Sequence, residues 1–218
     1  MFVKIVGVRG SGKSTVTAEM QRLFVSQGID TQMIKGSELM ARYLGIDPTE
    51  LSRVPERDRI RARQAVYKGL YAYDLLDPSP KVRLRDGHST IVQRDAYGDI
   101  RVSEVALVDG DANQLKAICL LDPSLPVILH RRRLDLKIRP ERNVVDLELL
   151  RSEWDYERRI ATRQAAKLDI PLYSIENERT VQETSKTLIT WMRYDLGDEL
   201  EKCKFDGYEE GSVRKEFA

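Results

Sequence analysis

The sequence contains little cysteine and little histidine, with two residues of each among 218. Cys119 and Cys203 lie far apart and match no metal-binding or redox spacing, so we expect no cysteine-based site and a reducing environment. Cys119 stands within an apolar run, where a buried thiol is expected.

The sequence also lacks an excess of charge of either sign and lacks long apolar runs. Basic and acidic residues number 36 and 35, a net charge of +1, so no overall field favours nucleic acid or a membrane surface. No apolar run approaches the roughly 18 residues of a membrane span. A glycine-rich loop that begins at residue 7 leaves no room for a cleaved signal peptide. We therefore expect a cytoplasmic protein with neither a membrane nor a nucleic acid partner.

That glycine-rich loop is the most informative feature present. It has the pattern G-x-x-x-x-G-K-[ST], and its residues are Gly7, Val8, Arg9, Gly10, Ser11, Gly12, Lys13, Ser14 and Thr15. An apolar run at 2–6 precedes it, and apolar residues follow it at helical spacing. In this context backbone N–H groups are expected to bind the α- and β-phosphates of a nucleoside triphosphate. Lys13 is expected to reach the β- and γ-phosphates, and Ser14 to bind Mg²⁺.

Five strand patterns alternate with helical patterns along the chain. The strands are expected at 2–6, at 31–34, around Val82 and Leu84, at 117–121 and at 171–175. This alternation predicts an α/β domain in three layers, with helices on both faces of a five-stranded parallel sheet. Ligands in such sheets bind beyond the carboxyl ends of the strands. The loop at 7–15, Gly36-Ser37, Asp86-Gly87-His88 and Asp122 should therefore converge.

The remaining segments carry weaker patterns. Residues 89–113 are polar and are interpreted as loop, and a short helix after the second strand is expected to be capped by Ser37. Residues 134–144 are charged and contain Pro140, which indicates a mobile loop. Beyond Asp195 we expect a charged tail or a frayed helix extension. The expected organisation is a kinase domain over 1–194, with an acceptor-binding region at about 36–76, a lid at about 131–144, and a tail over 195–218.

Three classes of nucleotide-binding protein compete. A GTPase switch requires Asn-Lys-x-Asp after a strand, which the sequence lacks. A regulatory ATPase usually has an apolar strand that ends in an acidic pair, and both Val105–Asp109 and Ile118–Asp122 fit that common pattern superficially. A small-molecule kinase is favoured by the arginines.

A kinase whose acceptor is itself a phosphate must bring two polyanions together, and guanidinium groups serve this purpose because they grip phosphate and stay charged. Arg131, Arg139 and Arg142 lie at or within the expected lid, and Arg158 lies on the helix that returns from it. A second group, Arg53, Arg57, Arg59, Arg61 and Arg63, precedes and begins another helix. For Arg59, Arg61, Arg63 and Arg132 a solvated helix face is the expectation.

Asp86 and His88 follow the third strand. A phosphate acceptor arrives largely ionised and needs no general base, whereas an alcohol or sugar acceptor needs one. Asp86 could serve as that base or could hold a water bound to Mg²⁺, and His88 could contact either nucleotide. The alternative is that Asp86 and His88 only cap the turn and have no catalytic or binding role.

In order, these residues resemble the archaeal-type adenylate kinases, a branch of the nucleoside monophosphate kinases. The resemblance covers roughly residues 1–192. It rests on the glycine loop, Gly36-Ser37-x-Leu39, Lys68-Gly69-Leu70, Asp86-x-His88, Asp122-Pro123, Arg131-x-x-x-Asp135, Arg139, Arg142-Asn143 and Arg158.

The resemblance implies a sheet in the order 2-3-1-4-5, Mg²⁺·ATP as phosphoryl donor and AMP as acceptor. It assigns neutralisation of the transferring phosphoryl group to Lys13, Arg131, Arg139 and Arg142, and acceptor contacts to Gly36, Ser37 and Arg53. It also implies homo-oligomers, often trimers. Two alternatives stay open: a kinase of a small alcohol or sugar with Asp86 as base, and a regulator that hydrolyses ATP.

Two features depart from the family pattern. The third strand reads Lys81-Val82-Arg83-Leu84-Arg85, although a central parallel strand is usually apolar on both faces. One face of it must therefore meet solvent, carboxylates or a ligand. Arg53 matches the acceptor arginine only if a one-residue gap is allowed.

Overall fold

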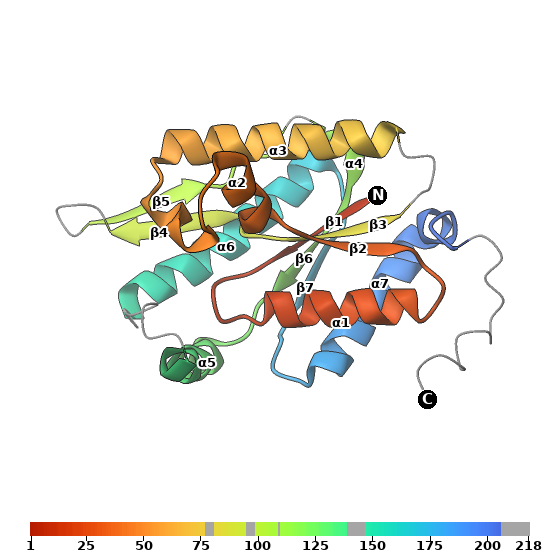
Figure 1. Ribbon diagram of the computed structural model, residues 1–218. Coiled ribbons are helices and arrows are strands. Elements are labelled where there is room, and N and C mark those ends of the chain that lie inside the picture. The colour runs from red at the N-terminus through yellow and green to blue at the C-terminus, as the bar shows by residue number, and fades with distance from the viewer. Residues whose placement is uncertain (77–80, 95–98, 109, 139–146, 206–218) are drawn as a thin grey trace.

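Five parallel strands form the central sheet of the computed structural model, in the order β2-β3-β1-β6-β7 (Figure 1). They are β1 (Phe2–Val6), β2 (Thr31–Lys35), β3 (Val82–Asp86), β6 (Leu115–Leu121) and β7 (Leu172–Ile175). The structure describes residues 1–76, 81–94, 99–108, 110–138 and 147–205. When the two strands of a separate hairpin are set aside, the order is the expected 2-3-1-4-5.

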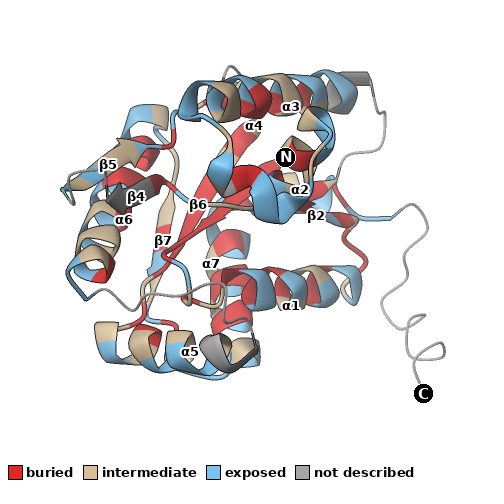
Figure 2. Ribbon diagram, turned by 60° about the vertical axis from the view of Figure 1, so that its left-hand side comes forward, coloured by how far each residue is buried: buried red, intermediate tan, exposed pale blue. Residues whose placement is uncertain are grey.

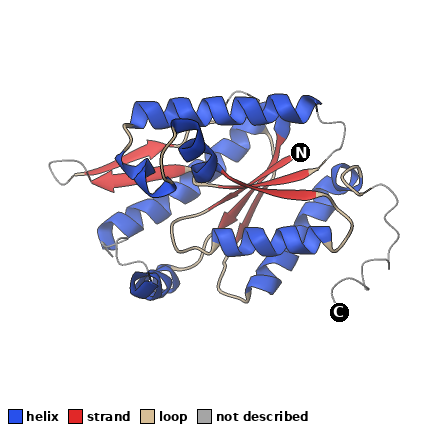
Figure 3. Ribbon diagram, in the orientation of Figure 1, coloured by secondary structure: helices blue, strands red, loops and turns tan. Residues whose placement is uncertain are grey.

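Helices cover both faces of this sheet, which confirms the three-layer α/β/α expectation (Figures 1 and 3). One face carries α1 (Lys13–Val25) and α7 (Val181–Glu201), and the other carries α3 (Glu56–Leu76) and α6 (Leu147–Leu168). Shorter elements follow the strands, namely α2 (Gly36–Leu44), the 3-10 helix η1 (Pro48–Arg53), α4 (Asp111–Gln114) and α5 (Leu125–Ile138). The helices α2 and α5 begin beyond the carboxyl ends of β2 and β6.

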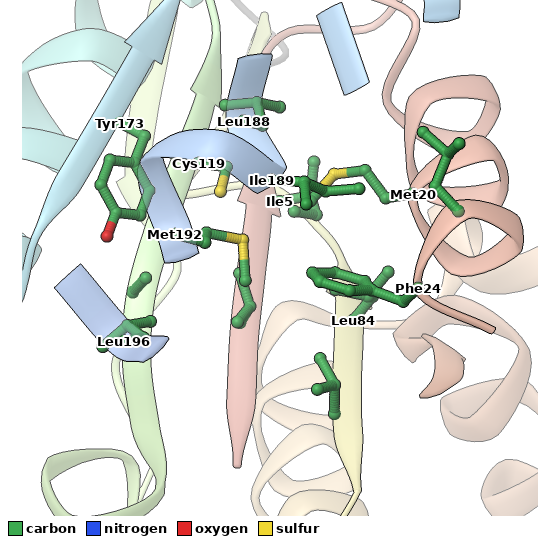
Figure 4. Packing of buried hydrophobic residues seen from close by; sticks show 14 of the residues in the cluster. Ile5, Met20, Phe24, Leu84, Cys119, Tyr173, Leu188, Ile189, Met192 and Leu196 are labelled. Carbon is green, nitrogen blue, oxygen red and sulfur yellow. The ribbon is translucent and has the colours of Figure 1, made fainter. Parts of the chain in front are cut away.

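The core is divided by the sheet into two apolar clusters. Val3 and Ile5 of β1 pack against α1 and α7, where Phe24 and Met192 are fully buried (Figure 4). Phe2 and Val6 of the same strand face α3 and α6. Because β1 is central, both of its faces are buried, and it appears as an unbroken buried strand in Figure 2.

The basic strand β3 meets a carboxylate and aromatic rings. Val82 and Leu84 join the cluster under α1 and α7, whereas Arg83 and Arg85 point to the α3 side and are 1% and 3% exposed. Arg85 pairs with the buried Asp111, with 3.0 Å between Nη1 and Oδ1, and its guanidinium lies 3.6 Å from the ring centroid of Tyr67. The sequence left solvent, carboxylates or a ligand as possible surroundings of this face, and in the structure Arg85 meets the carboxylate of Asp111.

Residues 89–113 are not the expected loop. They contain an antiparallel hairpin of β4 (Thr90–Arg94) and β5 (Ile100–Glu104), with Val92 opposite Val102, and then α4. The expectation was wrong because a two-stranded ribbon that covers a helix needs no continuous apolar run. Its first residues are instead held by hydrogen bonds to a buried carboxylate of α6, described below.

Two helices extend further than expected. The helix α5 continues to Ile138, so 134–138 are helical rather than loop, and the lid residues 139–144 lie outside the described residues. The helix α7 continues to Glu201, past the boundary expected at 195, and Leu196, Leu200 and Cys203 are buried in the core. The rest of the expected tail, 206–218, is outside the described residues. None of the described helices is both long enough and apolar enough to cross a membrane.

Candidate active site

The glycine loop lies between β1 and α1, as expected. Gly12 is the N-cap of α1, and its φ of +90° favours glycine. A Cβ at this position would approach Nδ2 of Asn177 to 2.8 Å, so the close packing of the loop also requires glycine here. The positive end of α1 therefore faces the loop, which is the arrangement that binds phosphate in proteins.

Lys13 is enclosed by the loop that it follows. Its ammonium donates hydrogen bonds to the carbonyl oxygens of Gly7 at 2.7 Å and Val8 at 3.1 Å. Burial lowers the pKa of Lys13 to about 8. A cation held within the curl of the loop suits the expected contact with the β- and γ-phosphates.

Ser14 and Asp86 lie together, although they are far apart in the sequence. The Ser14 hydroxyl donates a 2.6 Å hydrogen bond to Oδ2 of Asp86, which closes β3. His88 follows in the exposed turn, and the positive charge of the nearby Lys13 lowers its pKa well below the ordinary value. The structure thus brings together the loop, Asp86 and His88, as the strand-end rule predicts.

The Ser14–Asp86 pair fits a Mg²⁺ ion that accompanies a nucleotide. Mg²⁺ prefers oxygen ligands and is usually held by one or two carboxylates, substrate phosphates and several waters. A hydroxyl oxygen and a carboxylate oxygen 2.6 Å apart, next to a phosphate-binding loop, meet that requirement. Both residues expected to hold the metal therefore meet in one place.

The arginines at the start of the expected lid contact the glycine loop itself. Arg131 donates to the carbonyl oxygens of Ser11 at 3.1 Å and Asn177 at 2.7 Å. Arg132 donates to the carbonyl oxygen of Arg9 at 3.0 Å and pairs with Glu153. The solvated face expected for Arg132 is wrong, because its side chain is only 13% exposed and packs across the loop.

Arg158 is held at the end of the neighbouring strand. Its Nε lies 2.9 Å from Oδ2 of Asp122, and its guanidinium lies 4.6 Å from the ring centroid of Trp154. Burial raises the pKa of Asp122. The returning helix α6 thus brings Arg158 to the carboxyl edge, but against a carboxylate of the protein. Arg139 and Arg142 lie outside the described residues.

The expected acceptor residues are spread over the segment after β2. Gly36 is the buried first residue of α2, where a Cβ would collide with the Tyr67 hydroxyl of α3. Ser37 lies in the first turn of α2 and is exposed, so it is not the cap that the sequence suggested. Arg53 ends η1 and is exposed. Only Gly36 of these three is seen in close contact with the interior of the site.

Glu157, a buried carboxylate of α6, was not among the residues expected at the site. Its Oε1 accepts from the backbone N–H of Gly7 at 3.2 Å and of Ser89 at 2.6 Å. Its Oε2 accepts from the N–H and hydroxyl of Thr90 at 2.9 and 2.7 Å. In the sequence, the residues around Glu157 are those of an ordinary charged helix. Asn177 was also missed, but it follows the carboxyl end of β7, where the strand-end rule would have found it.

Comparison with known proteins supports the fold. No protein-family model and no curated protein matches the sequence. Among solved structures, a shikimate kinase from Aquifex aeolicus vf5 superposes with a TM-score of 0.52 at 17% identity, covering 89% of this chain and 98% of that one. A shikimate kinase from Acinetobacter baumannii in complex with shikimate gives a TM-score of 0.53 at 14% identity, with coverage of 89% and 94%. At these identities the likeness shows that the chain has the fold of P-loop kinases.

Proposed function

We propose that the protein is a nucleoside monophosphate kinase that transfers the γ-phosphoryl group of Mg²⁺·ATP to AMP, forming two ADP. The observation that carries the proposal is the hydrogen bond between Ser14 and Asp86. It directs the carboxylate at the end of β3 toward the metal and triphosphate side of the site. A carboxylate used in this way is not available to deprotonate an acceptor.

The other carboxylates near the site are also engaged. Asp122 pairs with Arg158, and Glu157 accepts from Gly7, Ser89 and Thr90. Within the described residues, each carboxylate at the carboxyl edge discussed above thus already has a partner. A hydroxyl acceptor needs a base to take its proton, whereas a phosphate acceptor has a second pKa near 6 and needs none. This distribution favours a phosphate acceptor.

The residues have distinct tasks under this proposal. The loop amides and Lys13 bind the phosphates of ATP and stabilise charge on the transferring group. Ser14 and Asp86 would hold Mg²⁺, which would neutralise charge on the phosphates. Arg131 is anchored on the loop, and Arg139 and Arg142 are proposed to reach the transferring group from the segment that follows α5. Both cysteines are free thiols, which agrees with the proposed cytoplasmic location.

The test is ADP formation from Mg²⁺·ATP in the presence of AMP, CMP, UMP, GMP or dAMP, each added singly, with products separated by chromatography. We expect an AMP-dependent rate that yields two ADP per turnover. Stimulation by another monophosphate would change the acceptor but keep the class. No stimulation by any of the five would contradict the proposal.

The second candidate is a kinase of a small alcohol, with Asp86 as general base. It is favoured by the position of Asp86 at the end of β3, between the loop and the segments that follow β2. Shikimate, which is bound in one of the similar structures, is a suitable first alcohol for the same assay. A protein that only hydrolyses ATP would form ADP and inorganic phosphate without a phosphorylated acceptor.

A further inference from the structure

Two arginines of α3, the buried Arg63 and the half-buried Arg59, have no anionic partner among the residues that the structure describes. Arg59 and Arg63 lie one helical turn apart, so their side chains leave the same face of the helix. Arg63 is only 9% exposed, and no hydrogen bond or ion pair joins it to any residue that the structure describes. The Nε atom of Arg59 is buried and has no hydrogen-bond partner. Arg61, between them, is exposed and pairs with Asp58 at 4.0 Å.

The surroundings of Arg63 add further positive charge. Burial, followed by the charge of Arg85, lowers the pKa of Arg63; Arg59 acts in the same direction, and Tyr67 and Glu56 act against it. Two buried carboxylates of this region already have partners. Asp111 accepts from Arg85 and Tyr71. Glu157 accepts four hydrogen bonds from the loop and the hairpin. Among the described residues, no carboxylate forms an ion pair with Arg59 or Arg63.

A largely buried guanidinium without a counter-ion is unfavourable, because burial removes much of its hydration and no anion replaces it. An anionic ligand would supply the counter-ion that the described residues do not provide. Arginine is well suited to such a ligand because it binds the oxygens of a phosphate in a bidentate manner.

The two arginines lie on the acceptor side of the site. The helix α3 crosses from β2 to β3, so its first turns lie near the carboxyl edge, beside α2 and the β4–β5 hairpin (Figure 1). Tyr67, one turn after Arg63, contacts Gly36 at the end of β2 and stacks under Arg85. Arg85 directly precedes Asp86, whose carboxylate reaches Ser14.

We propose that Arg63, assisted by Arg59, binds the phosphate group of the acceptor. This assignment rests on the proposed function, because it identifies where the phosphate of the monophosphate acceptor is held. It makes Arg63 a determinant of acceptor class, since a neutral alcohol would leave both guanidinium groups unpaired. Arg53, the acceptor arginine expected from the sequence, is exposed at the end of η1.

The test compares Arg63→Gln with the matched control Arg61→Gln from the exposed face of the same helix. AMP binding is measured by calorimetry with a non-hydrolysable Mg²⁺·ATP analogue already bound. We expect Arg63→Gln to weaken AMP binding at least about tenfold, and Arg61→Gln to change it less than about twofold. Binding of the ATP analogue should be unchanged in both variants. AMP binding by Arg63→Gln at wild-type strength would overturn the proposal.

Thermal unfolding gives a readout that a purely structural role would not produce. Since Arg63→Gln removes an uncompensated buried charge, its Tm without ligand should equal or exceed that of the wild type, while the stabilisation by AMP is lost. A lowered Tm with AMP stabilisation intact would contradict the assignment. If Arg63→Gln does not fold, Arg63→Lys keeps the charge but loses the bidentate geometry. It should bind AMP several-fold more weakly, and unchanged binding would again overturn the proposal.

Failure of the anion site and failure of the proposed function give different results. If the wild type forms ADP with AMP but Arg63→Gln keeps the wild-type KM for AMP, the function stands and the site is wrong. If no monophosphate is phosphorylated, inorganic phosphate becomes the probe, with Mg²⁺·ADP bound at the loop. Weaker phosphate binding by Arg63→Gln would then support the anion site without the kinase proposal, and absence of phosphate binding by the wild type would overturn it.

Discussion

The Ser14 hydroxyl and Oδ2 of Asp86 are 2.6 Å apart, which joins the first turn of α1 to the end of β3. The contact couples the residue that follows the loop lysine to the carboxylate that ends β3. Whether this carboxylate serves the metal or the acceptor decides between the two kinase classes.

Asp86→Asn separates these classes through the dependence on Mg²⁺. If Asp86 helps to hold the metal, the Mg²⁺ concentration for half-maximal activity should rise by about 10- to 100-fold, with part of the rate recovered at high Mg²⁺. The measurement is initial rate against free Mg²⁺ at saturating ATP and AMP. A large loss of kcat with an unchanged Mg²⁺ dependence would instead identify Asp86 as the base of a hydroxyl kinase.

Lys13→Ala should abolish phosphoryl transfer while the protein stays folded. The buried ammonium is expected to stabilise charge that develops on the phosphates, and loss of one such group typically costs at least about 10²-fold in rate. Steady-state rates are to be compared with circular dichroism spectra of both proteins. Lys116→Ala, at a half-buried position of β6 before the core of that strand, is the control. Wild-type turnover by Lys13→Ala would show that the active site has been misplaced.

Nucleotide binding should take up protons at alkaline pH because of Lys13. Its pKa in the free protein is about 8, compared with an ordinary value of 10.5, so the ammonium is largely neutral above pH 8. Phosphates favour the charged form and raise this pKa, so binding of Mg²⁺·ATP adds a proton and affinity falls as the pH rises through 8. Calorimetry at about pH 9 in two buffers with different ionisation enthalpies measures the uptake. Equal apparent enthalpies in both buffers would contradict it.

Glu157→Gln should destabilise the fold. The carboxylate is 2% exposed and accepts only, and the amide of glutamine would place a donor against the donors of Ser89 and Thr90. We expect the free energy of unfolding to fall by about 2–4 kcal/mol. Asp155→Asn, at an exposed position of the same helix, should change it by less than about 0.5 kcal/mol. Urea denaturation monitored by tryptophan fluorescence measures both, and equal losses would contradict the role of Glu157.

Lys4 gives the stability a dependence on pH. Its ammonium is buried in the middle of β1 and donates a 2.8 Å hydrogen bond to Oε1 of Gln164, and burial lowers its pKa to about 7. Between pH 7 and 10.5 the unfolded chain holds this proton and the folded chain does not, so the free energy of unfolding rises with pH. The slope from this group approaches about 1.4 kcal/mol per pH unit. Lys4→Met should flatten the curve over this window, and identical slopes in denaturation series would contradict the prediction.

The sequence was sufficient for the features that depend on local pattern. The glycine loop, the alternation of strands and helices, and the positions of Ser14, Asp86 and His88 followed from motif and period, and the parallel sheet then brought them together. The sheet order came from the resemblance to a known family. These features are robust because each is specified by neighbouring residues or by the topology of right-handed crossovers.

The features that were missed depend on partners distant in the sequence. The burial of Arg63 and Arg85 is set by how α3 packs on β3, and arginine on a helix ordinarily indicates solvent. Glu157 shows no distinctive spacing, because its partners belong to the loop and the hairpin. The extension of α7 past residue 195 rests on Leu196 and Leu200, whose apolar side chains alternate with charged residues that suggested a tail.

The last described residues of the chain are joined to the segment before β2. Asp30 donates its N–H to the carbonyl oxygen of Cys203 at 2.8 Å, and Phe205 donates to that of Gly28 at 2.7 Å. These contacts lie at the amino-terminal edge of the parallel sheet, opposite the edge that carries Ser14 and Asp86. A probe or surface linker attached at Phe205, which is 43% exposed, would therefore leave the nucleotide edge unobstructed. Single-molecule and immobilised binding assays on this protein have their natural point of attachment there.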